Sequence, residues 1–356
     1  MNAALLPAVR FFDALEAARE RGGSDVHVSA GLPPVLRVDG SLERLPEEPF
    51  SAEDVCAIVT ELFRDDQFAR LKAKGDHTTA RCDARFGTLR VHAYAGMGGW
   101  TIAVRLLDRE IPSLEALRLP QAMHSLAGRE RGLVIIAGPT GSGKSTTLAA
   151  LVDRINDTSG RRIVTIEDPI EYRHESRQSV VTQRELGRDT PELGVALRGA
   201  LRADPDVIVV GEMRDAESMA GALTAAETGH LVMTTLHTGN AAQTVERIVD
   251  SFSGSQQTQV RTQLAQVLAA VACQRLVPRA RGIGRCAIVE LLFGTDAVRN
   301  LIRESKAHQL KNVMATGKRF GMQTFEQHVA ELVRDRELDP AEAVRLGFAD
   351  AGKTVA

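Results

Sequence analysis

The chain has 356 residues, enough for two domains, and its hydrophobic fraction of 44% and charged fraction of 25% are ordinary for a soluble globular protein. A net charge of −2 argues against a polycation, so no nucleic-acid partner is expected. None of the four cysteines stands in a Cys-x-x-Cys pair, which argues against a zinc ribbon. The N-terminus lacks the pattern of a signal peptide, and no run of about 18 apolar residues occurs. We therefore expect a cytoplasmic protein without a transmembrane helix.

The first part of the chain mixes strand patterns with helical ones. Ser51 is followed three residues later by Asp54, which is the spacing of a capping box at the start of a helix. Strand patterns return over residues 78–107. We expect a smaller α+β domain over residues 1–108, followed by a linker over residues 109–131.

The second part of the chain, residues 132–356, has a different pattern. Short apolar, β-rich runs alternate with helical segments, which is typical of a parallel sheet that helices cover on both faces. The predicted class of this domain is therefore α/β, with a mostly helical pattern from about Phe252 onward. The apolar runs are residues 133–137, 163–166, 207–210 and 231–236.

Residues Gly138–Ser145 match the phosphate-loop pattern G-x-x-x-x-G-K-[ST] in full, between a strand pattern and a helical pattern. Glycines let main-chain N–H groups approach phosphate oxygens, Lys144 can reach the β- and γ-phosphates, and the Ser145 hydroxyl can bind Mg²⁺. A glycine-rich turn without a ligand is the alternative, but it leaves the agreement of strand, spacing and helix unexplained. The expected nucleotide-binding residues are Gly138, Pro139, Thr140, Gly141, Ser142, Gly143, Lys144, Ser145 and Thr146.

Polar residues stand at the ends of three other predicted strands: Glu167 and His237 follow their strands directly, and Glu212 follows after Gly211. Ligands of an open parallel sheet bind beyond the carboxyl ends of its strands, so we expect these side chains near the phosphate loop. ATP hydrolysis needs a group that orients water and a carboxylate that holds hydrated Mg²⁺. Glu167 and Glu212 are the candidates, and Glu212 is expected to reach Mg²⁺ through a water. The alternatives are acids exposed at strand ends and, for His237, a packed histidine.

Four blocks of the sequence resemble the ATPases of type II secretion and type IV pili, and most closely the PilT-like retraction ATPases. They are the phosphate loop and the segments that resemble the family's Asp box (162–172), atypical Walker B block (204–215) and His box (228–238). Residues 24–34 also resemble the family's PAS-like N-terminal domain, so the similarity extends over most of the chain. It implies a RecA-like P-loop ATPase domain beside a PAS-like domain.

The resemblance also implies a role for each site residue. Glu167 corresponds to the catalytic base, Glu212 to the acid on the Mg²⁺ side and His237 to the sensor of the His box. Arg90 and Arg105 stand where the N-terminal domain of the family supplies arginines that clamp the phosphates. A solvated strand face is the alternative for these two arginines.

As a member of this family the chain is expected to form a homohexameric ring at the inner face of the inner membrane. The ring would use ATP and Mg²⁺ to drive an inner-membrane platform protein and retract the pilus, and a paralogous retraction ATPase is a further candidate partner. Residues 297–304 resemble the retraction signature, although their periodicity alone predicts only an amphipathic helix with Ala297, Val298, Leu301 and Ile302 inward. The missing cysteine pairs of the other branches also favour retraction, whereas segment 76–94 matches the family poorly.

Other functions remain open at this point. Within the family, they are a pilus-extension or type II secretion ATPase and an accessory retraction motor. In a different class, the chain would be a nucleotide-regulated scaffold with little catalysis.

Overall fold

The computed structural model describes residues 5–38, 41–106, 110–281 and 284–348. The chain divides into two compact units, each described here by itself. The first unit comprises residues 1–110 and 169–172, and the second comprises residues 111–168 and 173–356. The predicted boundary at residue 108 lies outside the described residues, and the PAS-like character of the first unit stays a prediction.

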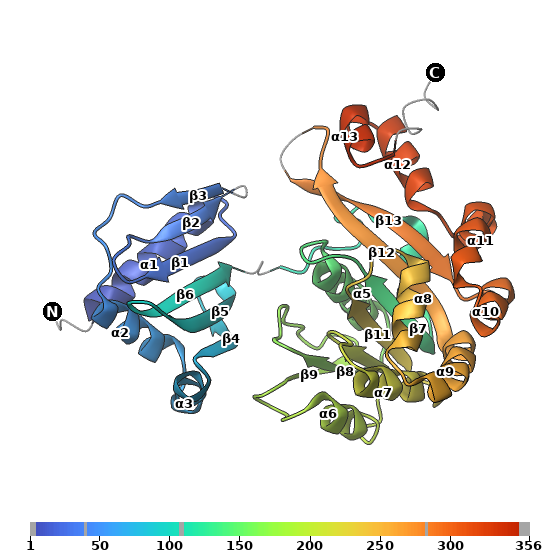
Figure 1. Ribbon diagram of the computed structural model, residues 1–356, viewed down its shortest axis with the longest axis horizontal. Coiled ribbons are helices and arrows are strands. Elements are labelled where there is room, and N and C mark those ends of the chain that lie inside the picture. Colours follow the sequence, from blue (N-terminus) through green and yellow to red (C-terminus); the bar gives the residue numbers. More distant parts are fainter. Residues whose placement is uncertain (1–4, 39–40, 107–109, 282–283, 349–356) are drawn as a thin grey trace. The chain divides into compact units, whose positions relative to one another are not determined.

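The first unit contains a six-stranded antiparallel sheet in the order β3-β2-β1-β6-β5-β4 (Figure 1). Its strands are β1 (Asp25–Ser29), β2 (Val35–Val38), β3 (Ser41–Arg44), β4 (Asp76–Asp83), β5 (Gly87–Gly96) and β6 (Gly99–Leu106). Its helices are α1 (Leu5–Glu20), α2 (Ala52–Leu62) and α3 (Asp65–Lys74).

Apolar residues at alternate positions along the strands give this sheet one buried face. Val26 on β1, Val91 on β5 and Val104 on β6 are fully buried in one core with residues of α1 and α2. The predicted capping box is confirmed at the start of α2, where Asp54 N–H donates to Ser51 Oγ at 3.1 Å and Ser51 N–H donates to the Asp54 carboxylate at 2.8 Å.

The second unit is built on a seven-stranded sheet in the order β13-β12-β7-β11-β10-β8-β9 (Figure 1). Six neighbouring strands are parallel and β13 is antiparallel at one edge. The predicted α/β class is confirmed, and all four predicted apolar runs are strands with buried interiors. The strands are β7 (Gly132–Ala137), β8 (Arg162–Glu167), β9 (Val180–Glu185), β10 (Val207–Val210), β11 (Leu231–Leu236), β12 (Leu268–Pro278) and β13 (Arg285–Phe293).

The helices of this unit begin with a short one, α4, in the segment that we expected to be a linker. That segment contributes Leu114, Met123 and Leu126 to the core of the second unit. Among the described residues, no helix is both long enough and apolar enough to cross a bilayer. The helices are α4 (Gln121–His124), α5 (Lys144–Thr158), α6 (Leu193–Ala200), α7 (Ala216–Glu227), α8 (Ala241–Asp250), α9 (Gly254–Val267), α10 (Asp296–Arg303), α11 (Leu310–Thr316), α12 (Phe325–Arg334) and α13 (Pro340–Arg345).

The expectation of a mostly helical segment after Phe252 is wrong for residues 268–278 and 285–293, which form β12 and β13. The first of these strands opens with six small apolar residues in a row, Leu268–Cys273, and all six are buried. Such a run has no period, so it cannot be distinguished from a buried helix by pattern. Pairing with β7 on one side and with β13 on the other stabilises this segment as a strand.

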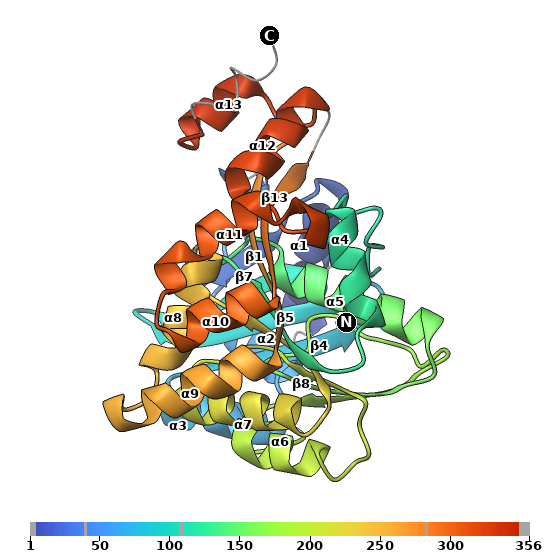
Figure 2. The ribbon, with the colours of Figure 1, turned by 90° about the vertical axis from the view of Figure 1, so that its right-hand side faces the viewer.

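The amphipathic helix predicted over residues 297–304 is present as α10, but with a narrower apolar face. Val298 and Ile302 are buried as expected and Leu301 is half-buried, whereas Ala297 is exposed. A helix this short buries only the stripe at i and i+4, and Ala297 falls outside that stripe. Helices α10 to α12 follow one another along the ribbon of β12 and β13 in both views (Figures 1 and 2).

We predict that acid destabilises the second unit through His328. This side chain is buried on α12, its Nδ1 accepts the Val289 N–H at 2.9 Å, and burial lowers its pKa to about 4. Between about pH 6.5 and about pH 4 this histidine is protonated in the unfolded chain but neutral in the folded chain. The free energy of unfolding is therefore full above about pH 6.5 and falls towards pH 4. We expect urea unfolding to show a loss of about 2 kcal/mol between about pH 7.5 and about pH 5 from this histidine.

The matched control is His328→Asn, whose amide oxygen can accept the same N–H without titrating. Its unfolding free energy should depend less on pH than that of the wild type. An equal loss in both proteins would assign the pH dependence to other groups, of which buried His174 is one, since burial also lowers its pKa to about 4.

Candidate active site

The predicted phosphate loop connects the end of β7 to the start of α5. Gly138 has a φ of 152°, and a Cβ there would lie 2.4 Å from the Gln274 carbonyl oxygen and 2.5 Å from Ser142 Oγ. Gly143, the residue before α5, has a φ of 84°. Only glycine accommodates this close approach and backbone conformation, so the loop has the form that main-chain anion binding requires.

Lys144 is the buried cation of this loop, with an exposed fraction of 7%. Its Nζ donates to the carbonyl oxygens of Gly138 at 2.9 Å and Pro139 at 3.0 Å. The Ser142 hydroxyl is also buried and has no hydrogen-bond partner among the described residues. A buried ammonium, a buried hydroxyl and the start of a helix together fit a phosphate group.

Four strand ends meet beside this loop because β7, β11, β10 and β8 are parallel neighbours. Ala137 pairs with Leu236 in register, and Val210 pairs with both Thr234 and Ile166. Glu167, Glu212 and His237 therefore lie on the same edge of the sheet as Lys144, where the sequence placed them.

His237 connects the loop to the acid of the neighbouring strand. Its Nδ1 lies 3.4 Å from Lys144 Nζ, and its Nε2 lies 3.2 Å from Glu212 Oε1. An ammonium can only donate and a carboxylate can only accept, so these contacts suit a neutral imidazole that carries its proton on Nε2. One imidazole ring therefore contacts both Lys144 and Glu212.

Two charged residues that the sequence reasoning did not select extend this line of contacts. Arg214 Nε lies 3.0 Å from Glu212 Oε2, and another nitrogen of the same guanidinium lies 3.6 Å from Asp168 Oδ2. Both residues stand inside the blocks that resemble the family, directly beside the selected acids, which was the available signal. Arg214 and Asp168 are exposed, so these pairs contribute little stability.

Glu167 is held by hydroxyl and amide donors. Its Oε1 accepts from Thr165 Oγ1 at 2.6 Å and from Gln183 Nε2 at 3.0 Å. The neighbouring strand end approaches it closely, because a Cβ on Gly211 would lie 3.3 Å from Glu167 Cα. The two candidate acids therefore occupy adjacent strand ends, with Glu212 on the side of the loop.

Arg90 and Arg105 lie in the first unit, on β5 and β6, where they are partners in register. Arg105 Nε donates to Asp25 Oδ1 at 2.8 Å. Their predicted contact with phosphates depends on how the first unit meets the second. The phosphate clamp therefore stays a prediction.

Mg²⁺ would find one hydroxyl and one carboxylate at this edge. Ser145 lies in the first turn of α5, and Glu212 lies two residues after the end of β10, on the far side of β11. Within the described ranges, no cluster of three His, Cys, Asp or Glu residues could hold a metal ion by itself. The donor set fits Mg²⁺, which usually takes one or two protein ligands together with phosphate oxygens and water.

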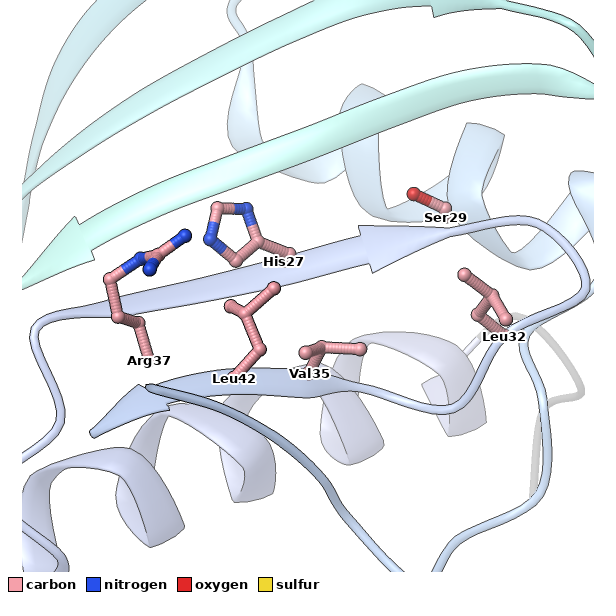
Figure 3. Close-up of a pocket in the computed structure, with 6 residues that line it drawn as sticks. All are labelled: His27, Ser29, Leu32, Val35, Arg37 and Leu42. Carbon is pink, nitrogen blue, oxygen red and sulfur yellow. The ribbon is translucent and has the colours of Figure 1, made fainter. Parts of the chain in front are cut away.

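A hollow of about 240 Å³ lies on the first unit, and its lining differs in chemistry from the candidate site of the second unit (Figure 3). It has an imidazole and a guanidinium but no carboxylate, and its other lining is mostly apolar. Burial lowers the pKa of His27, which favours a neutral ring. The hollow therefore lacks the acids that gather at the candidate site of the second unit. The hollow is lined by His27, Ser29, Leu32, Val35, Arg37 and Leu42.

Known proteins resemble this chain over most of its length. The type IV pilus retraction ATPase PilT of Pseudomonas aeruginosa is 44% identical over 322 residues, which are 90% of this chain and 92% of that protein. The type IV pilus ATPase PilU of the same organism is 39% identical over 325 residues, 91% of this chain and 85% of PilU. A crystal structure of the pilus retraction motor PilT with bound ADP superposes with a TM-score of 0.85 at 40% identity, covering 94% of this chain and 96% of that one.

We predict that Gly138→Ala lowers nucleotide affinity by at least about tenfold, because its Cβ would displace β12 or Ser142. Gly128→Ala is the control, since a Cβ there meets no atom within 4 Å and the residue lies outside the loop. Titration of both variants with a fluorescent ATP analogue measures the difference. Wild-type affinity in Gly138→Ala would contradict the tight packing of the loop against β12.

The family itself is identified by a sequence profile rather than by a single relative. The profile described as "Type II/IV secretion system protein" matches residues 7–344. This range contains the phosphate loop, all three polar strand ends and both arginines of the first unit. The chain therefore belongs to the type II/IV secretion system ATPase family.

Proposed function

We propose that this chain is the ATP-hydrolysing motor that powers retraction of a type IV pilus. The observation that carries the proposal is the continuous contact from Lys144 through His237 to Glu212 beside a complete phosphate loop. It brings a phosphate-loop cation and a strand-end acid to one site, and phosphoryl-transfer enzymes use such a cation together with a carboxylate on the Mg²⁺ side. The similarity to PilT supports retraction as the output.

The loop and its lysine would bind the phosphates of ATP. Main-chain N–H groups of residues 140–146 would donate to the phosphates, and Lys144 would neutralise the charge that develops on the γ-phosphate. Mg²⁺, when bound by Ser145 and through a water by Glu212, supplies further neutralisation of phosphate charge. His237 carries the state of the γ-phosphate to Glu212.

Glu167 would orient and deprotonate the attacking water. Its carboxylate accepts hydrogen bonds from Thr165 and Gln183, which fix its direction. Arg90 and Arg105 would approach the phosphates when the two units close. ATP can drive this closure only by binding the closed form more tightly than the open form.

A homohexameric ring would convert successive closures into movement of an inner-membrane platform protein, which removes pilin from the base of the fibre. The ring would lie in the cytoplasm against the inner face of that membrane. An accessory retraction motor that works with a paralogous ATPase is the second candidate, which the similarity to PilU favours. Pilus extension and type II secretion remain the alternatives with the opposite direction of transport.

Two substitutions separate binding from hydrolysis. Lys144→Ala should abolish ATP turnover through loss of phosphate binding, whereas Glu167→Gln should lower kcat by about 100-fold or more and leave ATP affinity within about threefold. Phosphate release and nucleotide titration on the purified proteins measure the two effects. Turnover at the wild-type rate in Glu167→Gln would exclude it as the base, and a wild type that releases no phosphate would favour the scaffold.

Deletion of the gene in its host tests the direction of transport. Loss of a retraction motor should leave many surface pili and abolish twitching, because fibres assemble but cannot be withdrawn. Counting pili by electron microscopy and measuring twitching zones reports both. A cell without pili would instead identify an extension ATPase, and normal twitching would point to the accessory motor.

A further inference from the structure

Gln274 on β12 is buried against the phosphate loop, with an exposed fraction of 1%. Cys273, the residue before it, pairs in register with Ala137, the last residue of β7. Gln274 therefore stands directly beside the point where the loop leaves the sheet. Its carbonyl oxygen occupies the space next to Gly138, where a Cβ would come within 2.4 Å.

Both ends of the Gln274 amide are used in hydrogen bonds to the loop and its helix. Nε2 donates to the Ser142 carbonyl oxygen at 2.5 Å, and Oε1 accepts from Thr147 Oγ1 at 3.0 Å. A carbonyl oxygen can only accept, so the amide has to present its nitrogen to Ser142. The orientation of this side chain is therefore fixed by chemistry.

The bond to Ser142 also determines the direction of a main-chain donor. The Ser142 carbonyl and the Gly143 N–H belong to the same planar trans peptide, in which the two groups point in opposite directions. Holding the carbonyl against β12 therefore directs the Gly143 N–H away from β12. Gly143 has the backbone freedom of a glycine, so this peptide would rotate easily without the restraint.

We propose that Gln274 is a positioning residue that holds the Ser142–Gly143 peptide in the orientation that binds nucleotide phosphate. This inference rests on the proposed ATP site and assigns to β12 a part in it. The bond to Ser142 carries this role, because burial against the loop already places the amide, and the bond to Thr147 satisfies the amide oxygen. The ligand chemistry is a phosphate oxygen that accepts from an aligned main-chain N–H.

The test compares three variants by titration with ADP, by steady-state ATPase kinetics and by thermal unfolding. Gln274→Glu keeps the size of the side chain but has no donor, when ionised, for the Ser142 carbonyl, and Gln274→Met removes both hydrogen bonds without adding charge. Thr147→Val is the matched control, because it breaks the helix-side bond and leaves the loop-side donor in place. Both positions are buried, so each of the three variants can lower the melting temperature.

We expect Gln274→Glu and Gln274→Met to weaken ADP binding by about tenfold and to raise KM for ATP more than they lower kcat. Thr147→Val should bind ADP within about twofold of the wild type, even if it melts at a lower temperature. If Gln274→Met binds ADP like the wild type, or if Thr147→Val loses as much affinity, the positioning role is wrong. A wild type that binds no ADP would instead contradict the nucleotide site itself, so the two failures are distinguishable.

Discussion

The parallel pairing of β7, β11, β10 and β8 is the constraint on which the candidate site depends. In a parallel sheet the carboxyl ends of all strands lie at the same edge. Strand pairing alone therefore makes neighbours of residues that are far apart in sequence. The contact between His237 and Glu212 follows from this arrangement. A shift of one residue in the register would turn the side chains of a whole strand to the opposite face.

The parallel pairing of these four strands explains why the positions of the site residues could be predicted from the sequence. The four central strands are buried on both faces and therefore appear as unbroken apolar runs, and a polar residue directly after such a run marks the ligand edge. Gly138 and Lys144 were equally visible, because an anion site made of main-chain groups needs glycine and a cation at fixed spacing. The placement of Glu167, Glu212 and His237 needed only the strand ends, whereas their catalytic roles stay predictions.

The strand β12, which packs against the loop, could not be predicted from the sequence in the same way. The strand β12 begins with Leu268–Cys273, which has no period, and its chemistry-bearing residue is an uncharged amide without a motif. Each of the two Gln274 hydrogen bonds contributes on the order of 1 kcal/mol, which is too little to impose a recognisable pattern on the sequence. Contacts such as Arg214 to Asp168 were missed for another reason: both residues are exposed, and solvated ion pairs leave no signal in hydropathy.

The phosphate loop itself explains why a support such as Gln274 is needed. The glycines that allow main-chain N–H groups to converge also increase the number of conformations that the loop can adopt, and each residue that is fixed costs about 1–2 kcal/mol of entropy. Lys144 cannot fix the loop alone, because binding a phosphate would draw its ammonium from the carbonyls of Gly138 and Pro139. A neutral amide that bonds to the outer side of the loop has no such competition with the ligand. It would restrain the loop with and without nucleotide, so less of the binding free energy would go into ordering the main chain.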